Sequence, residues 1–102
     1  MSIPSIYLQF KDEQPELVEA FENLSSACKS AGPLDPKTTA IAKLAIAIGS
    51  GMSGATHSAT RKALKAGCTR EELLHTAMLA TTTLGFPAMM RARCWVMDET
   101  DK

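Results

Sequence analysis

The stretch that decides the fold begins with Leu34-Asp35-Pro36-Lys37-Thr38 and ends with Ala63-Leu64-Lys65-Ala66-Gly67-Cys68-Thr69-Arg70-Glu71-Glu72-Leu73. Asp35 can accept hydrogen bonds from the free backbone N–H groups of a helix start, and Pro36 suits the first helical position because it has no N–H. Gly67 suits the end of a helix, because glycine adopts left-handed backbone angles easily. Thr69 and Glu72 have the spacing of a capping box, which predicts that another helix begins there.

The rest of the chain shows the apolar spacing of helices, and no segment has the pattern of a central strand. The predicted helices cover about residues 13–31, 35–49, 53–66, 69–84 and 87–97. In the first of them one stripe recurs at spacings of three and four, namely Leu17, Phe21, Leu24, Cys28 and Ala31. The glycines of Gly49-Ser50-Gly51 predict a break after the second helix. The pattern therefore indicates an all-α protein.

Both ends of the chain lie outside these helices. Apolar residues alternate loosely through residues 1–11, at Ile3, Ile6, Leu8 and Phe10, which predicts an extended arm. Residues 98–102 are polar and predict a frayed tail. A length of 102 residues suits a single domain over 1–102.

Composition bounds the partners and the compartment. A domain of this size buries only about 65% of the surface of its unfolded chain, yet 45% of the residues are hydrophobic, so we expect a homo-oligomer. The net charge is zero and no basic cluster occurs, which argues against nucleic acid. The apolar run 40–48 contains Lys43 and is too short to span a bilayer. Three widely spaced cysteines and no secretory signal indicate the cytoplasm.

The stretch from Leu34 to Leu73, with Gly85-Phe86-Pro87-Ala88 as a second match, resembles the carboxymuconolactone decarboxylase and alkyl hydroperoxidase D family. The resemblance covers about residues 14–97. It implies an orthogonal helical bundle of about five helices that assembles as a trimer or hexamer. Members that carry out thiol chemistry have a Cys-x-x-Cys-x-x-x-His run, and its histidine and a separate glutamate activate the cysteine thiol. The decarboxylase branch lacks the cysteines and acts on a cyclic lactone acid.

The register of this resemblance decides which site residues carry over. Counted back from Gly67 without gaps, the histidine position is Ala59, and the cysteine positions are Met52 and Ala55. The glutamate position, three residues after Lys37, is Ala40. A second register places His57, Ser50 and Ser53 at the histidine and cysteine positions. It requires shifts of two residues within one helix, which turn side chains by about 200°, so we favour the gapless register.

Three polar residues could replace the missing site. Ser53, His57 and Arg61 lie one turn apart, so they could present a positive edge to a small carboxylate. A Ser53–His57 nucleophile is less favoured, since no acidic residue lies nearby in sequence to orient the imidazole. An exposed histidine at a helix start is the alternative interpretation of His57.

Cys68 is the best candidate for a reactive thiol, because it lies at a helix start where an anion is favoured. A spacer beside the cap is its alternative role, and Cys28 and Cys94 are expected to be packed among apolar residues. The methionines could adapt to an apolar ligand or simply fill the core. His57 and His75, without clustered carboxylates, lack metal-ligand spacing, so we expect no metal and no cofactor.

These observations leave three functions open. They do not assign a catalytic role to any residue, although His57 and Cys68 are candidates. The first is an oligomeric binding or structural module with a degenerate active site. The second is a thiol-independent, decarboxylase-like enzyme that acts on a small cyclic carboxylate through His57. The third is a peroxidase-type antioxidant that relies on Cys68.

Overall fold

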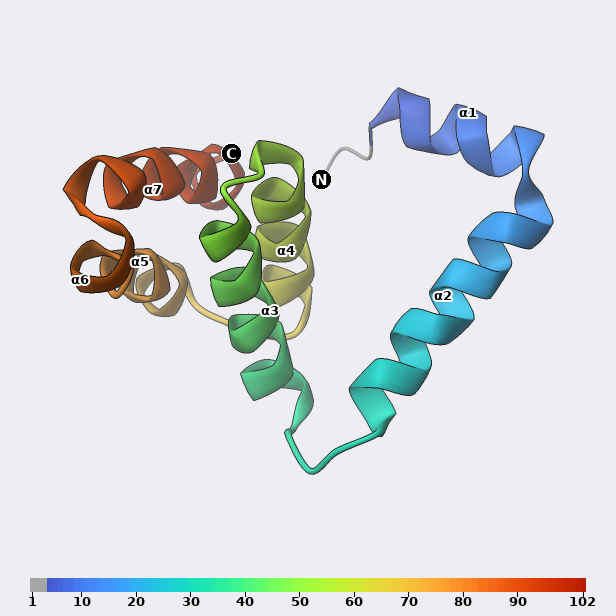
Figure 1. Ribbon diagram of the computed structural model, residues 1–102, viewed down its shortest axis with the longest axis horizontal. Coiled ribbons are helices and arrows are strands. Elements are labelled where there is room, and N and C mark those ends of the chain that lie inside the picture. The colour runs from blue at the N-terminus through green and yellow to red at the C-terminus, as the bar shows by residue number, and fades with distance from the viewer. Residues whose placement is uncertain (1–3) are drawn as a thin grey trace. The chain divides into compact units, whose positions relative to one another are not determined.

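The computed structural model describes residues 4–102 (Figure 1). Contacts within the chain separate it into two compact units, Met1–Leu34 and Asp35–Lys102. The sequence pattern did not indicate this division, and the expectation of one domain over 1–102 stays a prediction. The described residues form helices and contain no strand, so the all-α class is confirmed. No helix among these residues is long and apolar enough to cross a membrane.

The first unit consists of α1 (Ser5–Glu13) and α2 (Pro15–Ser30). The predicted extended arm is therefore wrong over residues 5–11, and its first three residues lie outside the described part. The helix expected from residue 13 begins instead at Pro15. Gln14 has φ −134° and ψ 65°, because the ring of a following proline excludes helical angles. Glu22 of α2 accepts a 2.9 Å hydrogen bond from the Tyr7 hydroxyl of α1.

The predicted apolar stripe of α2 lies at the surface of the chain. Leu17, Phe21 and Leu24 are 56%, 61% and 62% exposed. Exposure of this many large apolar side chains on one helix face is unusual in a monomer.

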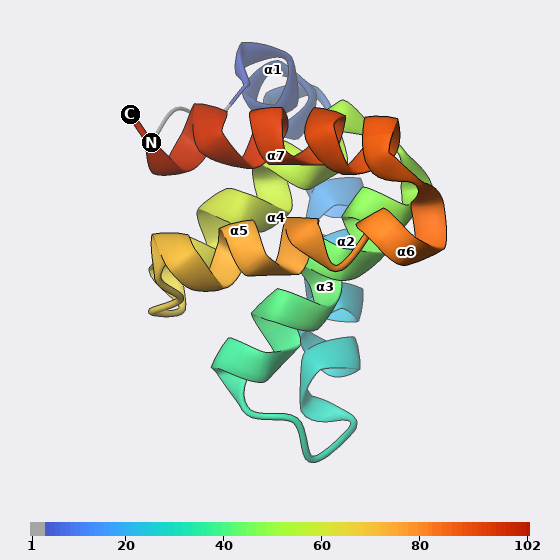
Figure 2. The same cartoon turned by 90° about the vertical axis from the view of Figure 1, so that its left-hand side faces the viewer.

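The second unit contains α3 (Pro36–Ser50), α4 (Ser53–Lys65), α5 (Arg70–Met78), α6 (Thr81–Leu84) and α7 (Phe86–Thr100). α3 packs against α4, and α7 packs against both α4 and α5. Figure 2 shows α7 lying across α4, with α5 beneath it. This unit is the orthogonal helical bundle that the resemblance implied.

The core of the second unit lies where α3, α4, α5 and α7 meet. Leu44, Leu73 and Val96 are fully buried, and Ala63 and Ala77 let the helices approach closely. Burial of each large side chain contributes about 1.5–3 kcal/mol to folding. This core fixes the positions of α4 and α7, which carry most of the candidate site residues.

The predicted helix boundaries agree closely with the structure. The Asp35 carboxylate accepts a 2.7 Å hydrogen bond from the backbone N–H of Thr38. Gly51 ends α3 with φ 73°, in the left-handed region that favours glycine. Thr69 and Glu72 form the predicted capping box, with bonds of 3.1 and 2.8 Å between each side chain and the other's N–H.

Two boundaries in the C-terminal half differ from the prediction. The helix expected over 69–84 divides after Met78, whose carbonyl accepts a 2.7 Å hydrogen bond from the Thr81 hydroxyl. This bond competes with the backbone hydrogen bonds of a continuous helix, and the β-branched threonines that follow have a low helix propensity. The predicted long helix is therefore interrupted, and the short helix α6 follows. The predicted frayed tail is also wrong, because α7 continues to Thr100 and Glu99 is only 6% exposed.

Candidate functional site

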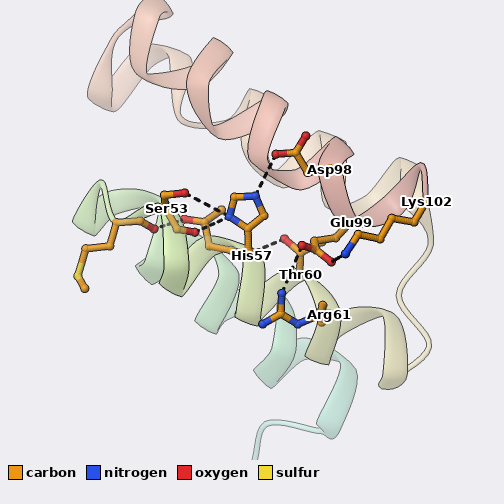
Figure 3. Close-up of polar contacts among 9 residues, drawn as sticks. Ser53, His57, Thr60, Arg61, Asp98, Glu99 and Lys102 are labelled. Carbon is orange, nitrogen blue, oxygen red and sulfur yellow. Dashed lines mark hydrogen bonds and ion pairs between the residues drawn. The ribbon is translucent and has the colours of Figure 1, made fainter. Parts of the chain in front are cut away.

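His57 links two helices that are far apart in sequence. It lies on α4, and its Nε2 atom is 3.0 Å from Oδ2 of Asp98 on α7 (Figure 3). Its Nδ1 atom is 2.7 Å from the backbone carbonyl oxygen of Ser53, one turn earlier on α4. The Trp95 ring lies beside the imidazole, with ring centroids 6.3 Å apart. The side chain of His57 is 22% exposed, so the expectation of an exposed helix-start histidine is wrong.

The partners of His57 favour its charged form. Burial lowers the pKa of the imidazole, but the hydrogen bond to Asp98, the Ser53 carbonyl and the charges of Asp98 and Glu99 outweigh it. The pKa of His57 therefore lies above its ordinary value of 6.5. A protonated imidazole donates from both nitrogens, so the Asp98 carboxylate and the Ser53 carbonyl each receive a hydrogen bond.

This geometry disfavours a nucleophile at Ser53. The Ser53 hydroxyl is 3.3 Å from Nδ1 of His57, and Asp98 supplies the orienting acid that the sequence did not reveal. However, Nδ1 lies closer to a carbonyl oxygen, which can only accept a hydrogen bond. Nδ1 must then carry a proton, and it cannot take one from the hydroxyl. The three residues resemble a catalytic triad in composition but not in protonation.

Arg61, the third predicted ligand-binding residue, also pairs with α7. Its Nη1 atom is 3.3 Å from Oε2 of Glu99, and their side chains are 16% and 4% exposed. Lys102 reaches the other oxygen of Glu99 at 3.0 Å. Figure 3 shows the Arg61 pair beside the His57 pair along the contact between α4 and α7. We call these five residues, His57, Arg61, Asp98, Glu99 and Lys102, the α4–α7 charge cluster.

Cys68 lies away from this cluster and is 5% exposed. Its sulfur is 3.8 Å from the carbonyl oxygen of Lys37, a weak contact at most. Burial and the charge of Glu72 raise the pKa of the Cys68 thiol, and Lys37 opposes them only in part. The expected stabilisation of a thiolate at this helix start is therefore not present.

The positions that the resemblance assigns to the thiol reaction carry no ionisable group. Ala40 of α3 and Ala59 of α4 pack against the buried core. Met52 precedes α4 and is 61% exposed, and Ala55 is half-buried. Under the second register, the Ser50 hydroxyl would replace a cysteine, but it donates a 2.6 Å hydrogen bond to the carbonyl of Ala47.

The remaining cysteines and methionines do not form a site of their own. Cys28 and Cys94 are both exposed, so the predicted burial of Cys28 is wrong, and packing of Cys94 in the core is excluded while packing at an interface stays a prediction. Met89 is buried, whereas Met52, Met78 and Met90 are exposed, so core filling describes only part of the methionine set. Among residues 4–102 no group of three histidine, cysteine, aspartate or glutamate side chains is placed to hold a metal ion.

An open surface groove of about 460 Å³ lies near the start of α3. It is lined by Asp35, Pro36, Lys37, Thr38, Ile41, Ala66 and Glu72. Its principal charges pair with each other, because Lys37 is 3.1 Å from Glu72. The two acids also serve as helix caps, so the groove offers few free polar groups to a ligand.

Comparison with known proteins identifies a family. No curated protein and no solved structure matches the chain significantly. The model of one protein family, the carboxymuconolactone decarboxylase family, matches residues 15–98. This match covers most of the chain, including all of α4 and α7 up to Asp98. The chain therefore belongs to the carboxymuconolactone decarboxylase family.

Proposed function

We propose that this family member has a degenerate active site and acts as a non-thiol binding or structural module. One observation carries the proposal: in the gapless register that we favour, Ala40, Met52, Ala55 and Ala59 stand where the thiol branch has its glutamate, cysteines and histidine. None of these side chains can hold or move a proton, and none supplies the thiol that the family's peroxide reaction uses. The packing of Ala40 and Ala59 against the core supports a role in folding rather than in chemistry.

The α4–α7 charge cluster supports the same proposal. A ligand carboxylate that bound Nε2 of His57 or Nη1 of Arg61 would compete with Asp98 or Glu99 for these donors. Such an anion would therefore have to displace a carboxylate that is held nearby by the fold. Paired charges between two helices are better suited to fixing their packing than to binding an anion.

A thiol-independent, decarboxylase-like enzyme is the second candidate. The observation in its favour is that His57 is positioned by an acid and stays 22% exposed, so a small cyclic carboxylate could reach it. The carboxylate of such a substrate would replace Asp98 as the hydrogen-bond acceptor at Nε2 of His57. The imidazole could then donate its proton in the reaction. His57→Gln should abolish turnover of any such substrate, and unchanged turnover would exclude this role for His57.

An antioxidant that relies on Cys68 has weaker support. Peroxide reduction requires an accessible thiolate and a resolving thiol. The sulfur of Cys68 is buried, and its pKa is raised by burial. We retain this function as an outcome of the assay below.

We also propose that the protein is a homo-oligomer, with a trimer or hexamer as the expected assembly. The exposed stripe of Leu17, Phe21 and Leu24 supports it, as do Ile46 and Leu79, which are 72% and 64% exposed. Sedimentation should give a mass above that of the 10.9 kDa chain at micromolar concentration. A stable monomer would contradict the proposal, and Phe21→Glu should weaken the assembly if α2 contributes to the interface.

A peroxide-reduction assay with a dithiol donor tests the proposed loss of thiol chemistry. The wild type should consume peroxide no faster than the Cys68→Ser variant or the donor alone. A thiol-branch family member, assayed in parallel, supplies the positive control. Turnover well above background that Cys68→Ser abolishes would replace our proposal with the antioxidant function.

A further inference from the structure

Two hydrogen-bond acceptors lie close to His57, and only the doubly protonated ring can donate to both; the Ser53 hydroxyl, 3.3 Å from Nδ1, is a third neighbour. The Ser53 carbonyl oxygen accepts at 2.7 Å from Nδ1, and the Asp98 carboxylate accepts at 3.0 Å from Nε2. Neither of these groups can donate a hydrogen bond, so each ring nitrogen must carry a proton to bond to its acceptor. An imidazole with two N–H groups is a cation, and a neutral imidazole must lose one of the two bonds.

We infer that protonation of His57 controls the order of the last turn of α7. While both ring nitrogens are protonated, His57 holds this turn against α4. When one proton leaves, the turn loosens. In the neutral form that keeps the proton on Nδ1, the lone pair of Nε2 faces the carboxylate of Asp98 and the link between the helices is lost. In the other form the link survives as a neutral donor to a carboxylate, which is weaker than a fully ionic pair.

The charged groups around His57 come from α4 and α7, the two helices that its side chain links. Asp98 and Glu99 of α7 both favour the imidazolium. Arg61, on the same helix as His57, is neutralised by Glu99 at 3.3 Å. Arg91 of α7 lies over the Trp95 ring, 5.6 Å from its centroid. Within residues 4–102, no charged side chain of α3 or α5 is among the groups that shift the pKa of His57.

The other links to the end of α7 do not change charge near neutral pH. Arginine side chains in general keep their charge throughout this range. Asp101, which Arg70 contacts at 2.6 and 3.1 Å, has a pKa of about 2 and stays ionised. Comparison with His57→Gln therefore tests whether a change in the order of this turn between pH 6 and 9 arises from His57.

The sign of the pH effect follows from the raised pKa. The folded chain binds the His57 proton more tightly than the unfolded chain does. The stabilising contribution is therefore fully present below pH 6.5 and is lost as the pH rises through the higher pKa of the folded state. Each unit between the two pKa values corresponds to about a tenfold change in the linked equilibrium. The inference does not depend on whether the protein is an enzyme.

An NMR titration of the two histidine rings tests the protonation state in the wild type. His75→Gln assigns the signals, because His75 is exposed on α5 and is the other histidine of the chain. The His57 signal should titrate with a midpoint above 6.5, and Asp98→Asn should lower that midpoint. A midpoint at or below 6.5 would overturn the inference, as would a midpoint that Asp98→Asn leaves unchanged.

Amide hydrogen exchange tests whether the proton controls the turn. The reporter is the N–H of Asp101, which donates to the carbonyl of Met97 at 2.9 Å, and amides of α5 supply the internal reference. After correction for intrinsic exchange, its protection should fall as the pH passes the His57 midpoint. His57→Gln should remove this dependence, and Asp98→Asn provides a second variant if the first unfolds. Equal pH profiles in the wild type and in a folded variant would overturn the inference.

Discussion

Replacing Arg61 with methionine should destabilise the protein strongly, because it leaves the Glu99 carboxylate buried without its main partner. The Glu99 side chain is 4% exposed, and Arg61 contacts it at 3.3 Å. Removing one member of a buried ion pair typically costs 3–5 kcal/mol. Lys102 remains 3.0 Å from the other carboxylate oxygen, so we expect the lower end, about 3 kcal/mol. Methionine keeps much of the apolar stem of arginine, which limits the contribution of lost packing.

Urea denaturation measures this loss, and a thermal midpoint lower by about 12 °C or more should accompany it. Arg70→Met is the matched control, since Arg70 also pairs with an acid at the end of α7 but both side chains are largely exposed. Its loss should be much smaller. The double variant Arg61→Met/Glu99→Met should recover most of the stability, because an apolar pair needs no charge partner. Equal losses in the two arginine variants would refute the argument that burial of Glu99 sets the cost.

Three further outcomes follow from burial and charge. Leu44→Ala should cost about 2–5 kcal/mol, because the side chain is fully buried, whereas Ile46→Ala should have little effect in urea denaturation unless an assembly covers that residue. A thiol reagent should label Cys28 and Cys94 in the native protein but Cys68 only after unfolding, and rapid native labelling of Cys68 would contradict its burial. The Arg70 hydrogen bond lowers the pKa of Asp101 to about 2, so its stabilising contribution is present above 3.8 and is lost as the pH falls through 2. Arg70→Met should therefore move the acid end of the stability profile to higher pH, and an unchanged profile would contradict that pairing.

The helix boundaries could be predicted because their signals are local. Asp35 acts on an N–H three residues away, and Thr69 and Glu72 cap each other within a single turn. The helix α1 was missed because Ile6, Leu8 and Phe10 fit an alternating pattern as well as a helical one. With so few apolar positions, periodicity cannot distinguish the two structures.

The partners of the candidate site residues could not be predicted in the same way. His57 and Asp98 are 41 residues apart, and only the packing of α7 on α4 brings them together. The predicted helix ends at residue 97, so the sequence pattern places Asp98 and Glu99 in a solvated tail rather than on α7. The one available signal was the pair of acids directly after an amphipathic helix, which is typical of a solvated tail as well as of an ion-pair anchor.

The acids at the end of α7 also bear on the order in which the chain folds. Asp98, Glu99 and Asp101 crowd the C-terminal end of this helix, where the backbone dipole repels negative charge. Lys102, which pairs with Glu99, offsets this repulsion locally, and the remaining compensation comes from His57, Arg61 and Arg70 on earlier helices. We therefore expect the last turn of α7 to become helical only after α4 and α5 are in place. Its formation then marks completion of the native fold rather than its nucleation.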